Sequence, residues 1–415
     1  MNGLLSGIKV VSLTHYLQGP SCAQFLADMG ADVIKVEREG GAYERHWSGA
    51  QAFVGDESVF YLLAGRNQRS IELDFRSDEG RALLWRLIED ADVLVENFRP
   101  GVLNKYGFSY ADTKDRNPRL VYCSLSGFGT TGPSANKPGQ DLLVQSLSGI
   151  GTINGRAGEP PSLVGSAIVD QHAATLGALG ITAALFGRQS SGVGAKVDSN
   201  LLSAALDLQL EPFNYHLNGA QLYERSASGI SSRFHQAPYG VFQTSDGWLT
   251  LSLCDGQTMA TAFEDARFAD FSKTDQFDLR EEINTRIAGH LRTKTTAEWE
   301  KIFDHVGMWN ARVRDYDEIE ADPQLAENES IVEYDLPRAG RIRTLNHPVR
   351  YDGAAPPLRR MPPSVGENTD EVLTELGYGT DDIAALRTAG AVGPDRAQTP
   401  FDRAASAPAS SYSRK

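Results

Sequence analysis

The sequence has few cysteines, no long apolar run and no excess of basic residues. Its three cysteines, Cys22, Cys123 and Cys254, lie far apart, and their odd number disfavours a disulfide framework and indicates reduced thiols. No window approaches the roughly 18 consecutive apolar residues of a membrane-spanning helix. Residues 1–10 also lack the basic and apolar regions of a signal peptide. We therefore expect a soluble protein that works in the cytoplasm.

The charge balance disfavours nucleic acid as the main partner. Lys and Arg number 40 and Asp and Glu number 54, which gives a net charge of −14 over 415 residues. An anionic small molecule can still be the ligand, provided that local basic residues bind it against the field of the whole chain.

Several common catalytic motifs are missing. The eight histidines form no H-E-x-x-H or H-x-x-E-H pattern, so no metal site is expected. The sequence has neither a G-x-S-x-G elbow nor a G-x-x-x-x-G-K-[ST] phosphate loop. Residues 127–132 match G-x-G-x-x-G, but Pro133, Asn136 and Pro138 continue an irregular loop where a dinucleotide site would open a helix. We interpret this motif as a glycine-rich turn.

Strands alternate with helices in the first part of the chain. Strands are expected at residues 8–13, 32–36, 70–74, 93–95 and 120–123, and helices at 21–29 and 78–89. This alternation predicts an α/β fold with a parallel, doubly wound sheet. The length exceeds what one core of roughly 250–300 residues accommodates, so a second domain is expected.

The pattern changes near residue 220. Residues 239–244 and 248–253, joined by a Ser-Asp-Gly turn, predict a β-hairpin, and Thr295 with Glu298 forms a capping box that opens a helix. We expect a smaller α+β domain at residues 226–327. After a proline-containing return, a helix capped by Asn368 is expected to run to Gly377. The last 23 residues are rich in Ala, Ser, Pro and Arg, which predicts a disordered tail.

Six segments together are similar to the class III CoA-transferases, the family of formyl-CoA transferase and carnitine CoA-transferase that also includes α-methylacyl-CoA racemase. Each segment alone is a weak signal, but their order along most of the chain is highly specific. They are residues 5–11 (LSGIKVV), 30–37 (GADVIKVE), 67–74 (NQRSIELD), 92–101 (DVLVENFRPG), 125–129 (LSGFG) and 366–373 (GENTDEVL).

This resemblance implies a Rossmann-like large domain, two long linkers, a smaller α+β domain and a dimer of two interlocked rings. The dimer accounts for linkers that would be unusual in a compact monomer. The implied division is 1–200 for the N-terminal part of the large CoA-binding domain, 201–225 and 328–348 for the linkers, 226–327 for the small domain, 349–392 for the segment that returns to the large domain, and 393–415 for the tail.

The resemblance also implies a site for coenzyme A, bound as an acyl-CoA substrate. The family places Gln18 and Gly19 near the thioester, and the phosphates of CoA suit arginine and lysine side chains or helix N-termini. For each basic residue alone, a solvated surface charge is the simpler interpretation. The family positions for CoA are Gln18, Arg38, Leu73, Asp74, Phe75, Arg76, Asn97, Phe98, Arg99, Lys105, Lys137 and Gln140.

Asp170 lies where the family has its catalytic aspartate, in the segment GSAIVDQH. The resemblance implies that its carboxylate attacks a thioester to give a mixed anhydride, which retains the acyl-transfer potential while the acids exchange. Backbone N–H groups around Gln18 and Gly19 would stabilise the oxyanions. The alternative interpretation of Asp170 is a helix N-cap after an apolar stretch.

Two other functions are open at this stage. In the racemases of the family a histidine base stands where this chain has Gln140, and glutamine cannot abstract an α-proton. His172 is then the alternative candidate for such a base. A CoA-binding protein without activity is the third hypothesis, and the presence of Asp170 speaks against it.

The sequence gives less information about the acid that accepts CoA. Formyl-CoA transferase has a glycine run where residues 253–257 read LCDGQ, which favours a larger acid than formate, such as a small dicarboxylate with succinyl-CoA as donor.

Overall fold

The computed structural model describes residues 3–396, and the chain divides into two compact units. Unit 1 comprises Met1–Asp141, Ile168–Ala204 and Pro323–Lys415, and unit 2 comprises Leu142–Ala167 and Ala205–Asp322. Among the described residues, no helix is long and apolar enough to cross a membrane. The predicted tail at 393–415 lies outside the described residues from residue 397 onward.

Unit 1 is built on a six-stranded sheet in which every pair of neighbours is parallel. The order across the sheet is β5 (Gln68–Glu72), β2 (Asp32–Glu37), β1 (Lys9–Leu13), β6 (Val93–Glu96), β7 (Val121–Ser126) and β8 (Lys196–Asn200). The strand sequence reverses direction between β1 and β6, and in such sheets ligands bind outside the carboxyl ends of the strands near the reversal. The predicted α/β class with a parallel sheet is confirmed. The edge strand β8 was not expected, because its five residues include a single apolar one, Val197.

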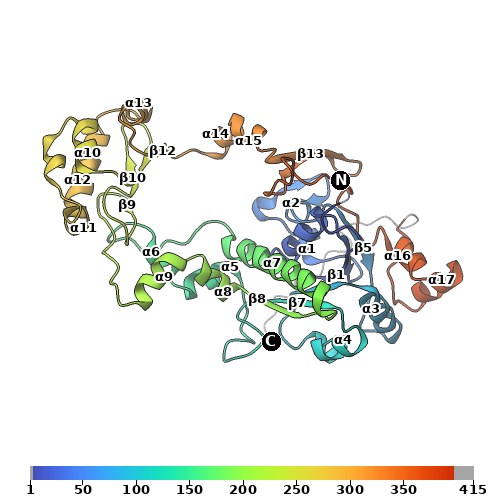
Figure 1. Cartoon of the computed structure of the whole chain (residues 1–415). Coiled ribbons are helices and arrows are strands. Elements are labelled where there is room, and N and C mark those ends of the chain that lie inside the picture. The colour runs from blue at the N-terminus through green and yellow to red at the C-terminus, as the bar shows by residue number, and fades with distance from the viewer. Residues whose placement is uncertain (1–2, 397–415) are drawn as a thin grey trace. The chain divides into compact units, whose positions relative to one another are not determined.

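The two faces of this sheet bury different helices, because successive side chains on a strand point to opposite faces. On β1, Val10 packs with α1 (Gln18–Asp28) and α7 (Ile168–Ser191), and Val11 packs with α3 (Asp78–Asp90), α16 (Thr369–Glu375) and α17 (Thr380–Thr388). Figure 1 shows α1 and α7 on one side of the sheet. This double coverage explains why the central strands β1, β6 and β7 consist mostly of apolar residues.

Helices α1 and α7 pack closely against each other on their face of the sheet. A Cβ added at Gly177 of α7 would lie 2.9 Å from Leu125 Cδ2 and 3.2 Å from Cys22 Sγ, so the close approach requires glycine. Because α1 joins the parallel strands β1 and β2, it runs back from the carboxyl edge of the sheet, and α7 runs back in the same way to enter β8. Both helices therefore begin at the carboxyl edge.

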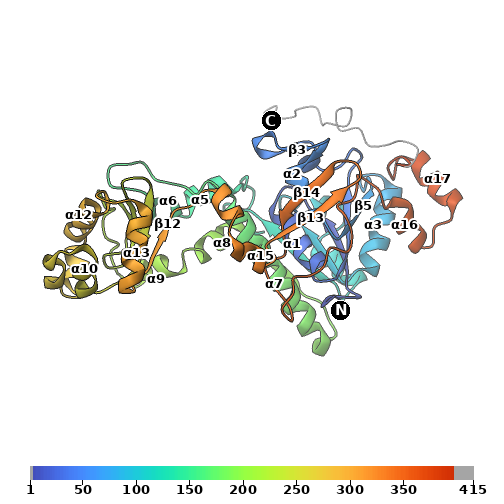
Figure 2. The ribbon, with the colours of Figure 1, turned by 90° about the horizontal axis from the view of Figure 1, so that it is seen from above.

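The C-terminal part of unit 1 returns to this sheet. Its hairpin of β13 (Ile331–Leu336) and β14 (Gly340–Leu345) packs against α2 (Val59–Leu62), as Figure 2 shows. The predicted helix after Asn368 is present as α16, but Asn368 does not cap it with its side chain. Its amide oxygen instead accepts the N–H of Ser70, which ties the helix to β5.

Unit 2 contains an antiparallel sheet in the order β12 (Asn310–Arg312), β11 (Trp248–Leu251), β10 (Gly240–Gln243) and β9 (Ile230–Ser231). The predicted hairpin is confirmed as β10 and β11, and the capping box opens α13 (Thr296–Val306). These strands pack against α10 (Gly256–Phe263), α12 (Arg280–Leu291) and α13 around Trp299 and Phe303.

The remaining elements are short. They are the 3-10 helices η1 (Tyr43–Arg45), η2 (Gly49–Gln51), η3 (Leu103–Tyr106) and η4 (Ala266–Asp270), the strands β3 (Phe53–Val54) and β4 (Glu57–Ser58), and the helices α4 (Tyr110–Arg116), α5 (Asp141–Leu147), α6 (Ile150–Ile153), α8 (Leu201–Asp207), α9 (Leu210–Leu217), α11 (Asp275–Asp278), α14 (Tyr316–Glu320) and α15 (Pro323–Glu327).

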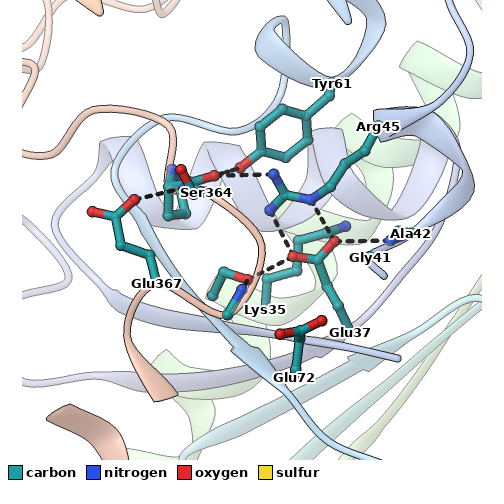
Figure 3. Close-up of polar contacts among 12 residues, drawn as sticks. Lys35, Glu37, Gly41, Ala42, Arg45, Tyr61, Glu72, Ser364 and Glu367 are labelled. Carbon is teal, nitrogen blue, oxygen red and sulfur yellow. Dashed lines mark hydrogen bonds and ion pairs between the residues drawn. The ribbon is translucent and has the colours of Figure 1, made fainter. Parts of the chain in front are cut away.

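A buried ion pair joins β2 to the returning C-terminal segment (Figure 3). The guanidinium of Arg45 donates to both carboxylate oxygens of Glu37, at 2.7 and 2.6 Å, and to the carbonyl of Pro363 at 3.0 Å. The ring of Tyr61 lies 3.8 Å from the guanidinium carbon, and the Oγ of Ser70 donates to Glu37. Burial alone would raise the pKa of Glu37, but the charge and hydrogen bonds of Arg45 outweigh it and hold the pKa at about 2.

We predict that Arg45→Met lowers the free energy of unfolding of unit 1 by about 3–5 kcal/mol, because the Glu37 carboxylate stays buried without its cation. The double variant with Glu37→Gln should recover most of the loss. Urea unfolding followed by hydrogen exchange of the β2 peptide measures both values.

Lys9→Met is the matched control, since its ion pair with Asp90 is exposed. It should cost less than about 1 kcal/mol. A loss for Arg45→Met as small as that of the control would contradict the assigned role of the pair.

Candidate active site

The strands of unit 1 bring most of the expected site residues to one edge of the sheet. Each group lies between a strand and the next strand along the chain: Gln18 and Gly19 after β1, Arg38 after β2, Leu73, Asp74, Phe75 and Arg76 after β5, Asn97, Phe98, Arg99 and Lys105 after β6, and Lys137 and Gln140 after β7. Because the strands are parallel, all these segments leave the sheet at its carboxyl edge. The glycine-rich segment 127–132 lies in the loop between β7 and α5 and opens no helix, as predicted.

The loop between β1 and α1 is held from two sides. The side chain of Asn97 accepts the N–H of His15 and donates to its carbonyl, both at 2.8 Å. The buried Lys35 donates to the carbonyl of Thr14 and to Glu44, whose carboxylate accepts the N–H of Tyr16. The amide of Asn97 therefore positions this loop, and the contact with CoA that the family resemblance implies for Asn97 stays a prediction.

Gln18 and Gly19 open α1 directly after this loop. Gln18 is only 6% exposed, yet its Nε2 has no hydrogen-bond partner among the described residues. A Cβ at Gly19 would lie 2.6 Å from Thr14 Cβ and 2.9 Å from Asn97 Cγ, so no larger residue fits there. The first N–H groups of a helix have no acceptor within the helix. This turn thus offers an unpaired amide donor and a positive helix end to an anionic group.

Asp170 lies in the first turn of α7 and is half-buried. It is the third residue of the helix, so it is not the N-cap that the alternative interpretation expected. The backbone N–H groups of Val169 and Asp170 instead donate to Oδ2 of Asp141, at 2.7 and 2.9 Å. Burial, together with the negative charge of Asp141, raises the pKa of Asp170 to about 7. Half of these carboxyl groups are therefore ionised near neutral pH.

The expected CoA residues differ in what their side chains can reach. Arg38, Arg99, Lys105 and Lys137 are exposed and can contact a phosphate. Arg76 is exposed as well, but its guanidinium is paired with Asp74. Leu73 is only 2% exposed and packs in the core, so its side chain is not accessible to a ligand. Gln140 is exposed, and Phe75 is half-buried.

A row of aromatic rings lies at the same edge. Phe75 contacts Tyr106 edge to face, with 5.3 Å between the ring centroids, and Phe98 contacts His15 in the same way at 5.0 Å. Phe75 and Phe98 also contact each other at 6.3 Å. Half-buried rings of this kind can stack on a planar heterocycle. Burial lowers the pKa of His15, which favours the neutral form of this ring.

Sequence reasoning missed three polar residues near the site. Asp141 caps α7 from the first position of α5, 28 positions before Val169, and no local sequence pattern predicts this contact. Lys35 could have been found from the sequence, because a lysine between the apolar residues of β2 is buried and therefore needs a polar partner. Glu96 is similar: it is buried at the end of β6, accepts bonds from Ser124 and the N–H of Phe98, and burial raises its pKa to about 7.

Comparison with known proteins agrees on one family. A family model described as CoA-transferase family III matches residues 5–369. Human succinyl-CoA:glutarate CoA-transferase is 31% identical over 397 residues, which covers 94% of this chain and 90% of the human protein. Succinyl-CoA–D-citramalate CoA-transferase of Chloroflexus aurantiacus is 32% identical over 396 residues, which covers 92% of this chain and 96% of that protein.

A solved structure agrees with these relatives. The crystal structure of a CAIB/BAIF family protein from Brucella suis covers 91% of this chain and is itself covered completely, with a TM-score of 0.77 and 28% identity. The resemblance found in the six sequence segments is therefore confirmed. This chain is a CoA-transferase, and it belongs to CoA-transferase family III.

Proposed function

We propose that the enzyme moves coenzyme A from an acyl-CoA donor to a free carboxylic acid and that Asp170 is its nucleophile. The observation that carries this proposal is the half-buried Asp170 carboxyl, which begins α7 at the edge where the basic and aromatic residues gather. The relatives named above act with succinyl-CoA and a dicarboxylic acid. We extend this substrate class to the present chain: succinyl-CoA as donor and a small dicarboxylate as acceptor.

The proposed reaction passes through two anhydrides. The Asp170 carboxylate attacks the donor thioester, which gives an aspartyl anhydride and CoA thiolate. The thiolate attacks the aspartyl carbonyl, which forms an aspartyl-CoA thioester and releases the donor acid. The acceptor carboxylate then attacks this thioester, and the thiolate released attacks the acceptor side of the second anhydride. The new acyl-CoA leaves and Asp170 is restored as a carboxylate.

The turn that opens α1 is suited to the oxyanions of these steps. The unpaired Nε2 of Gln18 and the N–H groups at the start of the helix are donors that need no reorganisation when charge develops. Asn97 and Lys35 act indirectly here, because they hold the loop that carries Gln18.

Coenzyme A would lie along the same carboxyl edge. Arg38, Arg99, Lys105 and Lys137 are exposed cations available to its phosphates, and Arg76 would have to exchange Asp74 for a phosphate. The rings of Phe75 and Phe98 offer a surface for the adenine. The doubly wound strand order supports a Rossmann-like large domain as the frame for this site.

We also propose the interlocked homodimer, in a reducing, cytoplasmic setting. The outer side of α7 supports it, because Leu179 is 63% exposed and Phe186 is 82% exposed. Large apolar side chains on one helix face favour burial against a partner. The domain ranges given by the sequence remain a prediction that accompanies this dimer.

Replacing Asp170 by Asn should abolish CoA transfer, a loss of at least about 1,000-fold, and leave CoA affinity within about threefold, because the amide is not a nucleophile but the phosphate contacts remain. Product formation by mass spectrometry and calorimetric titration with CoA measure the two quantities. Asp90→Asn, an exposed carboxylate at the opposite edge of the sheet, is the control and should leave both unchanged. Transfer by Asp170→Asn near the wild-type rate would exclude this mechanism, and α-proton exchange in its place would favour a racemase.

The pH dependence of kcat/KM for the acyl-CoA should report the ionisation of Asp170. Burial and Asp141 raise its pKa to about 7, so the nucleophilic carboxylate is lost as the pH falls through 7. We predict a drop of about tenfold per pH unit below that value and a plateau above it.

The control is the CoA affinity of Asp170→Asn over the same pH range, because it records the titration of the substrate phosphates and of protein groups other than Asp170, such as Glu96. The wild-type kcat/KM is divided by this control at each pH. If the resulting profile stays level down to pH 5, the fall below pH 7 cannot be assigned to Asp170.

A further inference from the structure

The carboxylate of Asp141 connects two points of the chain that are far apart in sequence. Asp141 is the first residue of α5 and is only 7% exposed. Its Oδ2 accepts the N–H groups of Val169 and Asp170, which lie 28 and 29 positions later. All three residues belong to unit 1, which the chain leaves after Asp141 and re-enters at Ile168.

This contact is placed where α7 needs an acceptor. The residue before the helix is Ala167, whose side chain cannot accept a hydrogen bond. The first N–H groups of a helix have no partner of their own and attract negative charge. Asp141 therefore does from a distance what a local Ser, Thr, Asp or Asn does at an ordinary N-cap.

The contact also fixes the segment 142–167 at its base. A segment of this length has many conformations, and its two ends meet only if something holds them. The hydrogen bonds of Asp141 hold the end of the segment 142–167 next to the backbone of Asp170, the residue that we assign as the nucleophile. A shift of this backbone moves the Asp170 carboxyl directly, and small displacements of a reacting group are costly to a rate.

We propose that Asp141 is a positioning residue for catalysis: its side chain holds the backbone of Asp170 and thereby orients the nucleophile toward the thioester. This inference rests on the proposed function of Asp170. The role differs from that of a CoA-binding residue, since the bonds end at two backbone amides. It also differs from a general stabilising contact, because one of these amides is that of Asp170 itself.

The test compares Asp141→Ala with Asp141→Asn. The alanine removes the acceptor, and the asparagine keeps a carbonyl oxygen at the same place for the two N–H groups. We expect Asp141→Ala to lower kcat by about 10- to 100-fold with the KM for acyl-CoA within about threefold, and Asp141→Asn to regain kcat to within about fivefold of wild type. Steady-state kinetics and calorimetric titration with CoA give these values.

Gln145→Ala is the matched control on the same helix. The Gln145 side chain is buried and bonds to Val164 and Ser166, so its loss loosens the segment 142–167 without touching the backbone of Asp170. Its kcat should stay within about threefold of wild type. An equal fall of kcat in Gln145→Ala and Asp141→Ala would assign the effect to loosening of the segment and overturn the proposal.

Two further outcomes are distinct. If Asp170→Asn still transfers CoA, the proposed function fails, and the positioning role falls with it. If Asp170 is essential but Asp141→Ala keeps the wild-type kcat, or raises KM without lowering kcat, the positioning role alone is overturned. Thermal unfolding of each variant gives the fraction of folded protein, and kcat is expressed per folded molecule. A variant that merely folds less well is then distinguished from one in which Asp170 is mispositioned.

Discussion

The buried ion pair between Glu37 and Arg45 is the interaction on which the carboxyl edge of the sheet depends (Figure 3). Glu37 is the last residue of β2, and both of its carboxylate oxygens accept hydrogen bonds from Arg45. The same guanidinium contacts the ring of Tyr61 in α2 and donates to the carbonyl of Pro363 in the returning segment. Ser70 of β5 joins the pair, so two strands and two distant segments share one polar centre. Without its partner, each of these charges would destabilise the core in which it lies.

Function follows from this edge by simple geometry. Parallel strands all end at the carboxyl edge of the sheet. The helices that connect one strand to the next begin at this edge, and their first N–H groups have no partner within the helix. Of these, α1 begins with Gln18 and Gly19, and α7 begins beside Asp170. The protein uses the polar residues Lys35 and Asn97 to hold the loop before α1. Under the proposed function, the exposed cations would bind the phosphates of CoA and the Asp170 carboxyl would perform the chemistry.

The sequence predicted the regular strands and helices of the fold, and its assignment of Asp170 as the catalytic carboxyl stays a prediction. It missed contacts that depend on tertiary structure. The strands β1, β2, β6 and β7 carry apolar stretches. In contrast, β8 is mostly polar, and the β13–β14 hairpin mixes apolar with charged residues and is partly exposed, so neither has a continuous apolar run. The family motif identifies Asp170, whereas its contact with Asp141 spans 29 positions. Local patterns also cannot show that Asn368 bonds to β5 or that Asn97 holds a loop.

The central claim is that Asp170 is acylated during turnover, and a trapping experiment tests it most directly. The enzyme is incubated with succinyl-CoA and no acceptor acid, then treated with hydroxylamine, which converts an activated carboxyl to a hydroxamate and spares ordinary carboxylates. Peptide mapping should find the modification on Asp170, and Asp170→Asn should carry none. An unmodified Asp170 under conditions where transfer is measurably occurring would contradict the covalent mechanism and favour direct transfer between the two bound substrates.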